Sequence, residues 1–289
     1  MMSYNTQKQI KHDLMVVVLA VFAFLVILPL VLILTSSFKN EQELFDYPFH
    51  LFPRKPILSN FSRLKEHFPT YIWNSIRLTI VITVVQLVTA STGAYAFAKL
   101  RWKGRDAVFA LYLASMMVPT QAITIPQFLI IRSMGLYDTH LALVLIGAFT
   151  AIGTFLIRQA FLSIPPTFSE AARIDGASEW SIFLRVVLPM AKATLMTQMI
   201  FSFRFFWNDF FNPLIYITSS ELKTLPLGMT DFVSDQYTYW GPQLAATLIS
   251  IIPVLVIFLG GQKSFVQGVA SSGIMSKNMV IQCSLPFIM

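Results

Sequence analysis

Long apolar runs are the feature of this chain that most constrains its fold. Of the 289 residues, 55% are hydrophobic and 12% are charged, whereas a soluble globular domain has roughly 25% charged residues. Runs of about 20 apolar residues match the roughly 30 Å hydrocarbon core of a bilayer. The sequence therefore predicts an all-α membrane protein with about six transmembrane helices. We place these spans at about residues 14–35, 72–98, 108–131, 141–161, 191–216 and 244–262.

The distribution of Lys and Arg predicts the orientation of the spans. The first run, residues 14–34, is longer than the apolar part of a signal peptide and indicates an uncleaved helix. A cytoplasmic N-terminus places most cations inside, most densely at residues 99–105, as the positive-inside rule requires. We expect both termini to be cytoplasmic and the loops 36–71 and 217–243 to lie outside. The net charge of +7 then reflects membrane topology and not nucleic-acid binding.

Several kinds of chemistry are excluded by what the sequence lacks. Cys283 is the only cysteine, so neither an intramolecular disulfide nor a cysteine-based metal site is expected. The four histidines stand far apart, mostly in loops, and predict no metal site. There is no GxxxxGK[ST] phosphate loop, so the chain cannot itself be an ATPase. We expect no catalytic residues and no cofactor in this chain.

Polar residues line one face of several spans. Such a face serves helix packing in lipid, or it lines a pathway for a polar substrate, and the pattern leaves both open. Pro119 and Pro126 also predict a kinked third span. The polar faces consist of Ser75, Thr79, Thr83, Gln86 and Gly93; of Gly147, Thr150, Thr154 and Arg158; and of Thr194, Gln198, Ser202, Phe205, Asn208 and Asn212.

Charged residues within apolar sequence suggest a translocation pathway. Arg77 lies near the outer end of the second span, where it can reach the interface, and Arg204 and Asp209 lie in the fifth. A buried arginine costs about 2.5 kcal/mol or more, so Arg204 should face protein or water. The surrounding aromatics could stack on sugar rings or face lipid and core. The pathway candidates are Arg77, Gln86, Arg204, Asn208, Asp209 and Asn212.

A polar segment, EAARIDGASEWSIFLRVVLP at residues 170–189, interrupts the apolar sequence. Gly176 predicts a chain reversal, since glycine adopts positive φ without a Cβ penalty. Trp180 and Phe183 are three residues apart on one helix face, with Ile182 nearby. An apolar knob with a polar rim suits a cleft on a partner protein. The alternative is an ordinary amphipathic helix on the membrane surface.

This segment resembles the cytoplasmic EAA loop of ABC importers, and other motifs resemble the smaller membrane subunit of their carbohydrate-uptake group. The resemblance covers about residues 11–270. It implies a type I ABC importer permease fold with a cytoplasmic coupling helix, in the bacterial plasma (inner) membrane. The further motifs are WNS at 73–75, STGAYAFAKLRWKGR at 91–105, MVPTQAITIPQFLIIRSMGLYDT at 117–139, WNDFFNPL at 207–214, TLPLGM at 224–229 and FVQG at 265–268.

The resemblance also implies partners and site residues. The expected partners are a second homologous permease subunit, two ATPase subunits that bind ATP and Mg²⁺, an extracytoplasmic solute-binding protein and the lipid bilayer. The chain would be a translocation subunit and not an enzyme. The residues expected to couple it to the ATPase are Glu170, Ala171, Ala172, Asp175, Gly176, Trp180, Phe183, Leu188 and Pro189.

The expected organisation is a cytoplasmic N-terminus (1–13), one transmembrane permease domain (14–270) with a coupling loop at 165–190, and a tail (271–289). The tail departs from the family pattern, and Val186 replaces the usual isoleucine. Cations near the pathway suit an acidic oligosaccharide such as alginate, although arginines in such a bundle can also be structural. A secondary transporter or channel not driven by ATP is the alternative. It has no use for a docking loop, and the chain shows no pair of related halves.

Overall fold

The structure, a computed structural model, describes residues 4–233 and 237–260. In this part of the chain the regular elements are helices, together with one isolated bridge between Val233 and Thr238. The chain divides into two compact units. The first contains the described part of Met1–Pro69 and Met229–Ile252, and the second contains Thr70–Gly228 and the described part of Pro253–Met289. The all-α expectation is confirmed, and the 271–289 tail and Cys283 lie outside the described residues.

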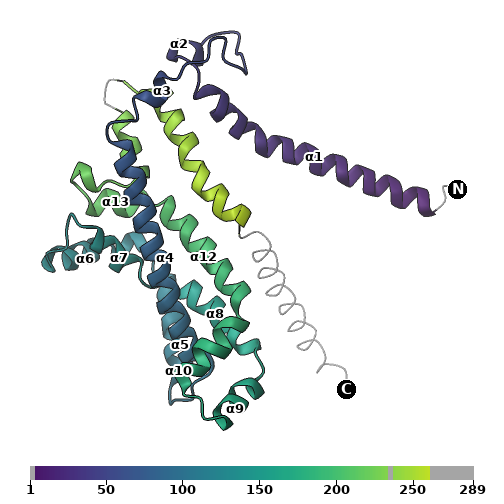
Figure 1. The fold of residues 1–289 in the computed structure, drawn as a ribbon, viewed down its shortest axis with the longest axis vertical. Helices are drawn as coiled ribbons and strands as arrows, with labels where there is room; N and C mark the ends of the chain where they lie inside the picture. Colours follow the sequence, from purple (N-terminus) through teal and green to yellow (C-terminus); the bar gives the residue numbers. More distant parts are fainter. Residues whose placement is uncertain (1–3, 234–236, 261–289) are drawn as a thin grey trace. The chain divides into compact units, whose positions relative to one another are not determined.

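The first unit begins with one long helix, α1 (Tyr4–Ser36), shown in purple in Figure 1. Its stretch His12–Ser36 is long and apolar enough to cross a membrane, and none of its most apolar window is buried within the chain. Apolar surface of this extent must be covered by lipid or by another subunit. The unit also contains α2 (Glu41–Leu44), α3 (Ser59–Ser62), η4 (Met229–Phe232) and most of the helix Trp240–Gly260.

Asn60 joins the parts of the first unit. Its Nδ2 donates to the carbonyl oxygens of Ser37 (2.9 Å) and Lys39 (2.8 Å). Gly241 packs against the same side chain, because a Cβ at this position would lie 2.5 Å from Asn60 Oδ1. The loop after α1 is therefore fixed at its base by a buried amide.

The second unit is built around α4 (Phe68–Ala98), whose polar face packs inward. Ser75, Thr79, Thr83 and Gln86 are all buried, as expected for helix packing through small and hydroxyl-bearing residues. The other helices are α5 (Arg105–Ala114), η1 (Ser115–Met117), α6 (Thr120–Ser133), α7 (His140–Gly147), α8 (Ala151–Ser163), α9 (Pro166–Ile174), α10 (Glu179–Ile182), η2 (Phe183–Val187), α11 (Leu188–Met190), α12 (Lys192–Trp207), α13 (Phe211–Tyr216), η3 (Ser220–Leu222) and α14 (Leu225–Gly228).

Three of the six expected spans are not single straight helices. The pair Arg105–Met117 and Thr120–Ser133 is bent by 100°, His140–Gly147 and Ala151–Ser163 by 44°, and Glu179–Met190 and Lys192–Trp207 by 81°. The bend after Met117 confirms the kink expected at Pro119 in the third span. The spans placed at 141–161 and 191–216 were expected without a break, and the structure interrupts them at residues 148–150 and 208–210. The count of six holds if each bent pair forms one span.

The breaks have local causes. Pro119 precedes α6 and has no N–H to continue the helix before it. Thr150 caps α8, because its side chain accepts a bond from the N–H of Gly153. The fifth span is interrupted again after Trp207, so the residues 208–210 separate α12 from α13.

The carboxylate of Asp138 links the segment before α7 to the segment after α13. Asp138 has a positive φ of 58°, and its carboxylate accepts bonds from the N–H groups of Thr218 (2.8 Å) and Ser219 (3.0 Å) and from the Ser219 hydroxyl. The Ser219 hydroxyl, followed by the two backbone donors, lowers the pKa of this carboxyl below its ordinary value of 3.8.

Candidate coupling loop and translocation residues

The coupling loop (residues 165–190) reverses direction at Gly176. This residue has a φ of +80°, in the left-handed region that only glycine enters without strain. Two bonds close the end of α9: the Gly176 N–H donates to the Arg173 carbonyl (3.0 Å), and the Ala177 N–H donates to the Ala172 carbonyl (2.9 Å). Ser178 then caps α10 by accepting from the Ser181 N–H. The expected reversal at this glycine is present.

The inner side of the coupling loop packs against the end of α4. Ile182, Phe183 and Val187 are buried in one cluster with Tyr95 and Phe161. The Phe183 ring lies 5.0 Å from that of Tyr95 and 6.5 Å from that of Phe161, measured between centroids. The loop is thus a packed extension of the helical unit and not a loose connection.

Glu179 links three elements through its carboxylate. Its Oε1 accepts a bond from Arg173 Nε (2.7 Å), across the turn at Gly176. Its Oε2 accepts a bond from the Tyr95 hydroxyl on α4 (2.7 Å). A nearby bond from Lys99 Nζ to the Ile164 carbonyl (2.8 Å) fixes the chain before α9. Sequence reasoning missed this linkage, although opposite charges on the two sides of the turn were a signal for it.

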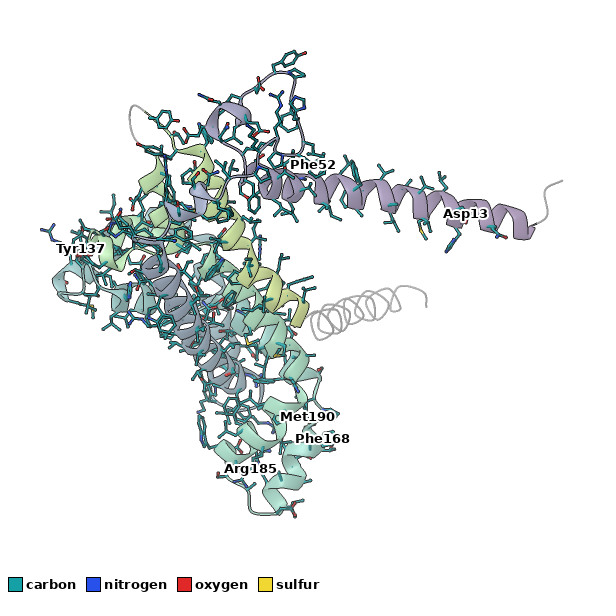
Figure 2. All side chains as sticks on the ribbon, turned by 45° about the horizontal axis from the view of Figure 1, so that its top comes forward. Asp13, Phe52, Tyr137, Phe168, Arg185 and Met190 are labelled. Carbon is teal, nitrogen blue, oxygen red and sulfur yellow. The ribbon has the colours of Figure 1, made fainter. Side chains whose placement is uncertain are left out.

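The outer side of the coupling loop is exposed. Glu170, Ala171, Asp175, Gly176 and Pro189 are accessible to solvent. Its apolar part is also accessible: Trp180 is 61% exposed, Ile174 87% and Phe168 50%. Figure 2 labels Phe168, Arg185 and Met190 at the same end of the second unit.

The expected apolar knob of Trp180, Ile182 and Phe183 is divided between two sides. The rings of Trp180 and Phe183 do contact each other, at 5.3 Å between centroids. However, Ile182 and Phe183 are 0% and 3% exposed and belong to the core. The exposed apolar residues of the loop include Phe168, Ile174 and Trp180, whereas Ala172 and Leu188 pack partly against the core.

Gln86 lies in a buried polar network at the break between α7 and α8. Its Nε2 donates to the Gly147 carbonyl (2.9 Å), and its Oε1 accepts from the Ser202 hydroxyl. Gln198 Nε2 donates in turn to the Ser202 oxygen (3.0 Å). The amide satisfies a carbonyl freed at the end of α7, which favours a packing role for this pathway candidate.

Arg77 on α4 contacts His140, the first residue of α7. Its guanidinium donates to Nδ1 of His140 (2.7 Å), and His140 Nε2 donates to the Leu222 carbonyl (2.9 Å). The arginine is exposed while it bonds His140.

The remaining pathway candidates cluster at the break between α12 and α13. Arg204 and Asn208 are exposed, and Asn208 Nδ2 donates to the Arg204 carbonyl (2.8 Å). Asp209 accepts from the backbone N–H (3.2 Å) and the Nδ2 (2.8 Å) of Asn212. The structure therefore brings these four residues together and leaves the Arg204 side chain exposed.

Metal binding has no support in the described part of the chain. Among residues 4–233 and 237–260, no three or more His, Cys, Asp or Glu side chains are grouped so that they could hold a metal ion.

Comparison with known proteins identifies a transport-system membrane family and permease proteins as relatives of this chain. Residues 88–270 match the family model described as "binding-protein-dependent transport system inner membrane component". The probable ABC transporter permease protein YurM of Bacillus subtilis is 34% identical over 264 residues, covering 88% of this chain and 87% of that protein. The lactose transport system permease protein LacG of Rhizobium radiobacter is 32% identical over 204 residues, covering 71% and 75%.

A solved structure agrees with these relatives. A chain in the crystal structure of a bacterial ABC transporter involved in the import of the acidic polysaccharide alginate superposes with a TM-score of 0.80 at 28% identity. The match covers 90% of this chain and 98% of that chain. The likeness confirms the importer-permease fold expected from the sequence.

Proposed function

Because the chain belongs to the family of binding-protein-dependent transport system inner membrane components, we propose that it is the sugar-translocating subunit of an ATP-driven importer. The observation that carries the proposal is the TM-score of 0.80 over 90% of the chain to a permease of the alginate importer. The relative named for lactose transport supports the same substrate class. In this role the chain passes a sugar or oligosaccharide from an extracytoplasmic binding protein into the cytoplasm.

The coupling loop is the proposed docking site for the ATPase subunits. Its exposed residues include the apolar Trp180 and Ile174 and the carboxylates of Glu170 and Asp175, a composition that fits a cleft on a partner protein. Hydrolysis of ATP, with Mg²⁺, takes place on that partner, since this chain has no phosphate loop. A second permease subunit covers the apolar surfaces that this chain leaves exposed.

Force can pass from the docked loop into the bundle through direct contacts. A displacement of α9 acts on Glu179 through Arg173, and Glu179 acts on α4 through Tyr95. The packed rings of Phe183 and Tyr95 move with them, since a packed core transmits displacement rather than absorbing it. A secondary transporter or channel would not need an exposed coupling loop that is held against α4 in this way.

Within the sugar class, an acidic oligosaccharide such as alginate is the proposed substrate. The exposed Arg204 supplies a cation near the end of α12, and the superposed chain belongs to an importer of an acidic polysaccharide. Arginine is well suited to a carboxylate because its donors form a planar fork.

The test is reconstitution. The chain is co-expressed with its candidate partner permease, ATPase and binding-protein subunits, and the purified complex is placed in proteoliposomes. We expect ATP-dependent uptake of alginate trisaccharide, lactose or both. Uptake that continues without ATP, or a purified chain that never retains an ATPase subunit, contradicts the proposal.

A further inference from the structure

The first unit contains a hollow that the coupling and pathway residues do not use. Its volume is about 880 Å³, and it lies between the α2 region, the start of α3 and residues 237–240. This volume falls within the range of roughly 300–1,000 Å³ typical of small-molecule sites. The residues important for the argument are Glu41, Phe45, Arg63, Tyr237 and Trp240.

Aromatic side chains form one wall of the hollow. The rings of Phe45 and Trp240 meet edge to face, with centroids 6.1 Å apart and an interplanar angle of 74°. Phe45 is 70% and Trp240 45% exposed, so part of each ring is accessible. An aromatic belt at a membrane interface also exposes such rings, but a belt does not place them around a concave surface beside polar side chains.

The polar groups of the hollow include an unsatisfied acceptor. Oε1 of Glu41 is buried and has no hydrogen-bond partner among the described residues. Leaving such a buried oxygen unpaired is destabilising, and a ligand with hydroxyl donors would supply the missing hydrogen bond. Arg63, with its guanidinium 5.6 Å from the centre of the Tyr239 ring, adds donors at the rim.

We propose that this hollow binds one pyranose ring of the transported oligosaccharide. A pyranose has an apolar C–H face that packs on an aromatic ring, here Trp240 or Phe45, and hydroxyl groups that donate to Glu41 and accept from Arg63. The inference rests on the proposed function, because it takes its ligand class from there. It adds a sugar site in the first unit, separate from the pathway candidates of the second.

The experiment measures sugar binding to the complete importer complex in nanodiscs, without its binding protein. The probes are lactose and alginate trisaccharide, and binding is followed by saturation-transfer difference NMR. We expect Trp240→Ala and Glu41→Gln each to weaken binding of the bound probe at least fivefold. Tyr47→Ala is the matched control, because Tyr47 is an aromatic residue of the same unit that is 93% exposed and does not line the hollow.

Trp240→Phe protects the test against a folding defect, since it keeps an aromatic ring and should weaken binding less than Trp240→Ala. Equal binding by wild type, Trp240→Ala and Glu41→Gln overturns the inference, as does an equal loss in Tyr47→Ala. Uptake assays on the same preparations separate the two proposals. If the wild-type complex imports neither sugar, the proposed function fails; if it imports sugar while the variants bind normally, only the pyranose site fails.

Discussion

Replacing Glu179 by Gln tests how the coupling loop is braced against the bundle. The side chains of Arg173 and Glu179 are 43% and 45% exposed, so their ion pair contributes only about 0.2–1 kcal/mol. The hydroxyl of Tyr95, a residue that is 6% exposed, donates to a charged acceptor, and such a bond contributes about 1.5–3 kcal/mol. The amide of glutamine retains part of the second bond. We therefore expect a loss of about 2 kcal/mol in the docking of the coupling loop on α4, an approximately 30-fold shift in that equilibrium.

The assay is the number of ATP molecules hydrolysed per sugar imported by proteoliposomes. When the contacts of Glu179 with Arg173 and Tyr95 are weakened, the ATPase should continue to hydrolyse ATP, but fewer cycles should open the pathway. The number of ATP molecules hydrolysed per sugar imported should therefore rise severalfold. Tyr95→Phe should raise it in the same direction. Arg185→Gln and Tyr137→Phe are matched controls: Arg185 is another exposed arginine of the loop, and the Tyr137 hydroxyl lies 2.6 Å from that of Thr218, far along the chain from the loop.

The double variant Tyr95→Phe/Glu179→Gln adds a check on the contact itself. Because both changes weaken the Tyr95–Glu179 hydrogen bond, the effect of the double variant on the ratio should be smaller than the sum of the two single effects. A wild-type ratio in both single variants would refute the claim that Glu179 and Tyr95 hold the coupling loop against α4. Fully additive effects would mean that the two residues act separately.

Four further outcomes are expected. Gly176→Leu forces a branched side chain to a φ of +80°, at a cost of about 1–2 kcal/mol, and should leave membrane insertion intact while uncoupling ATP hydrolysis from uptake; normal coupling would contradict this. The lowered pKa of Asp138 means that its stabilisation is present above pH 3.8 and is lost as the pH falls through the folded-state pKa. Asp138→Asn should therefore lower the melting temperature at pH 7, and its difference from wild type should shrink as the pH is lowered below 3.8. Arg204→Gln should reduce uptake of alginate trisaccharide more than that of lactose, whereas an equal fall in complex stability for both would indicate a bond to the other permease. In a cysteine-free background, an impermeant thiol reagent applied to intact cells should label Ser59→Cys and not Lys103→Cys; the opposite pattern would invert the topology.

The helical class and the turn of the coupling loop could be predicted because their signals are local. The length of an apolar run indicates a membrane span, and Gly176 in EAARIDG indicates that the chain reverses direction there. The bends could not be placed in this way, since a hydropathy window sums composition and does not record a change in helix direction. Pro119 indicated one break, whereas the break before Thr150 depends on a cap that hydrophobic periodicity does not reveal.

The candidate site was predictable in position but not in orientation. Spacing correctly indicated that Trp180 and Phe183 touch, but the pattern does not say which apolar side meets the core. Packing against Tyr95 decides that Phe183 points inward. Likewise, a glutamine within a span can line a pathway or cap a free carbonyl, and only the position of Gly147 relative to Gln86 favours the second role.

The central claim is that a separate ATPase docks on the exposed side of the coupling loop. A photoreactive amino acid at position 174, where Ile174 is 87% exposed, tests it directly, with position 52 as the control because Phe52 is 68% exposed in the first unit. After irradiation of the assembled complex, we expect mass spectrometry to find a crosslink from position 174 to the subunit that carries the phosphate-binding loop, and none to that subunit from position 52. A complex that imports sugar with ATP but gives no ATPase crosslink from position 174, or gives one from position 52 instead, would contradict the account.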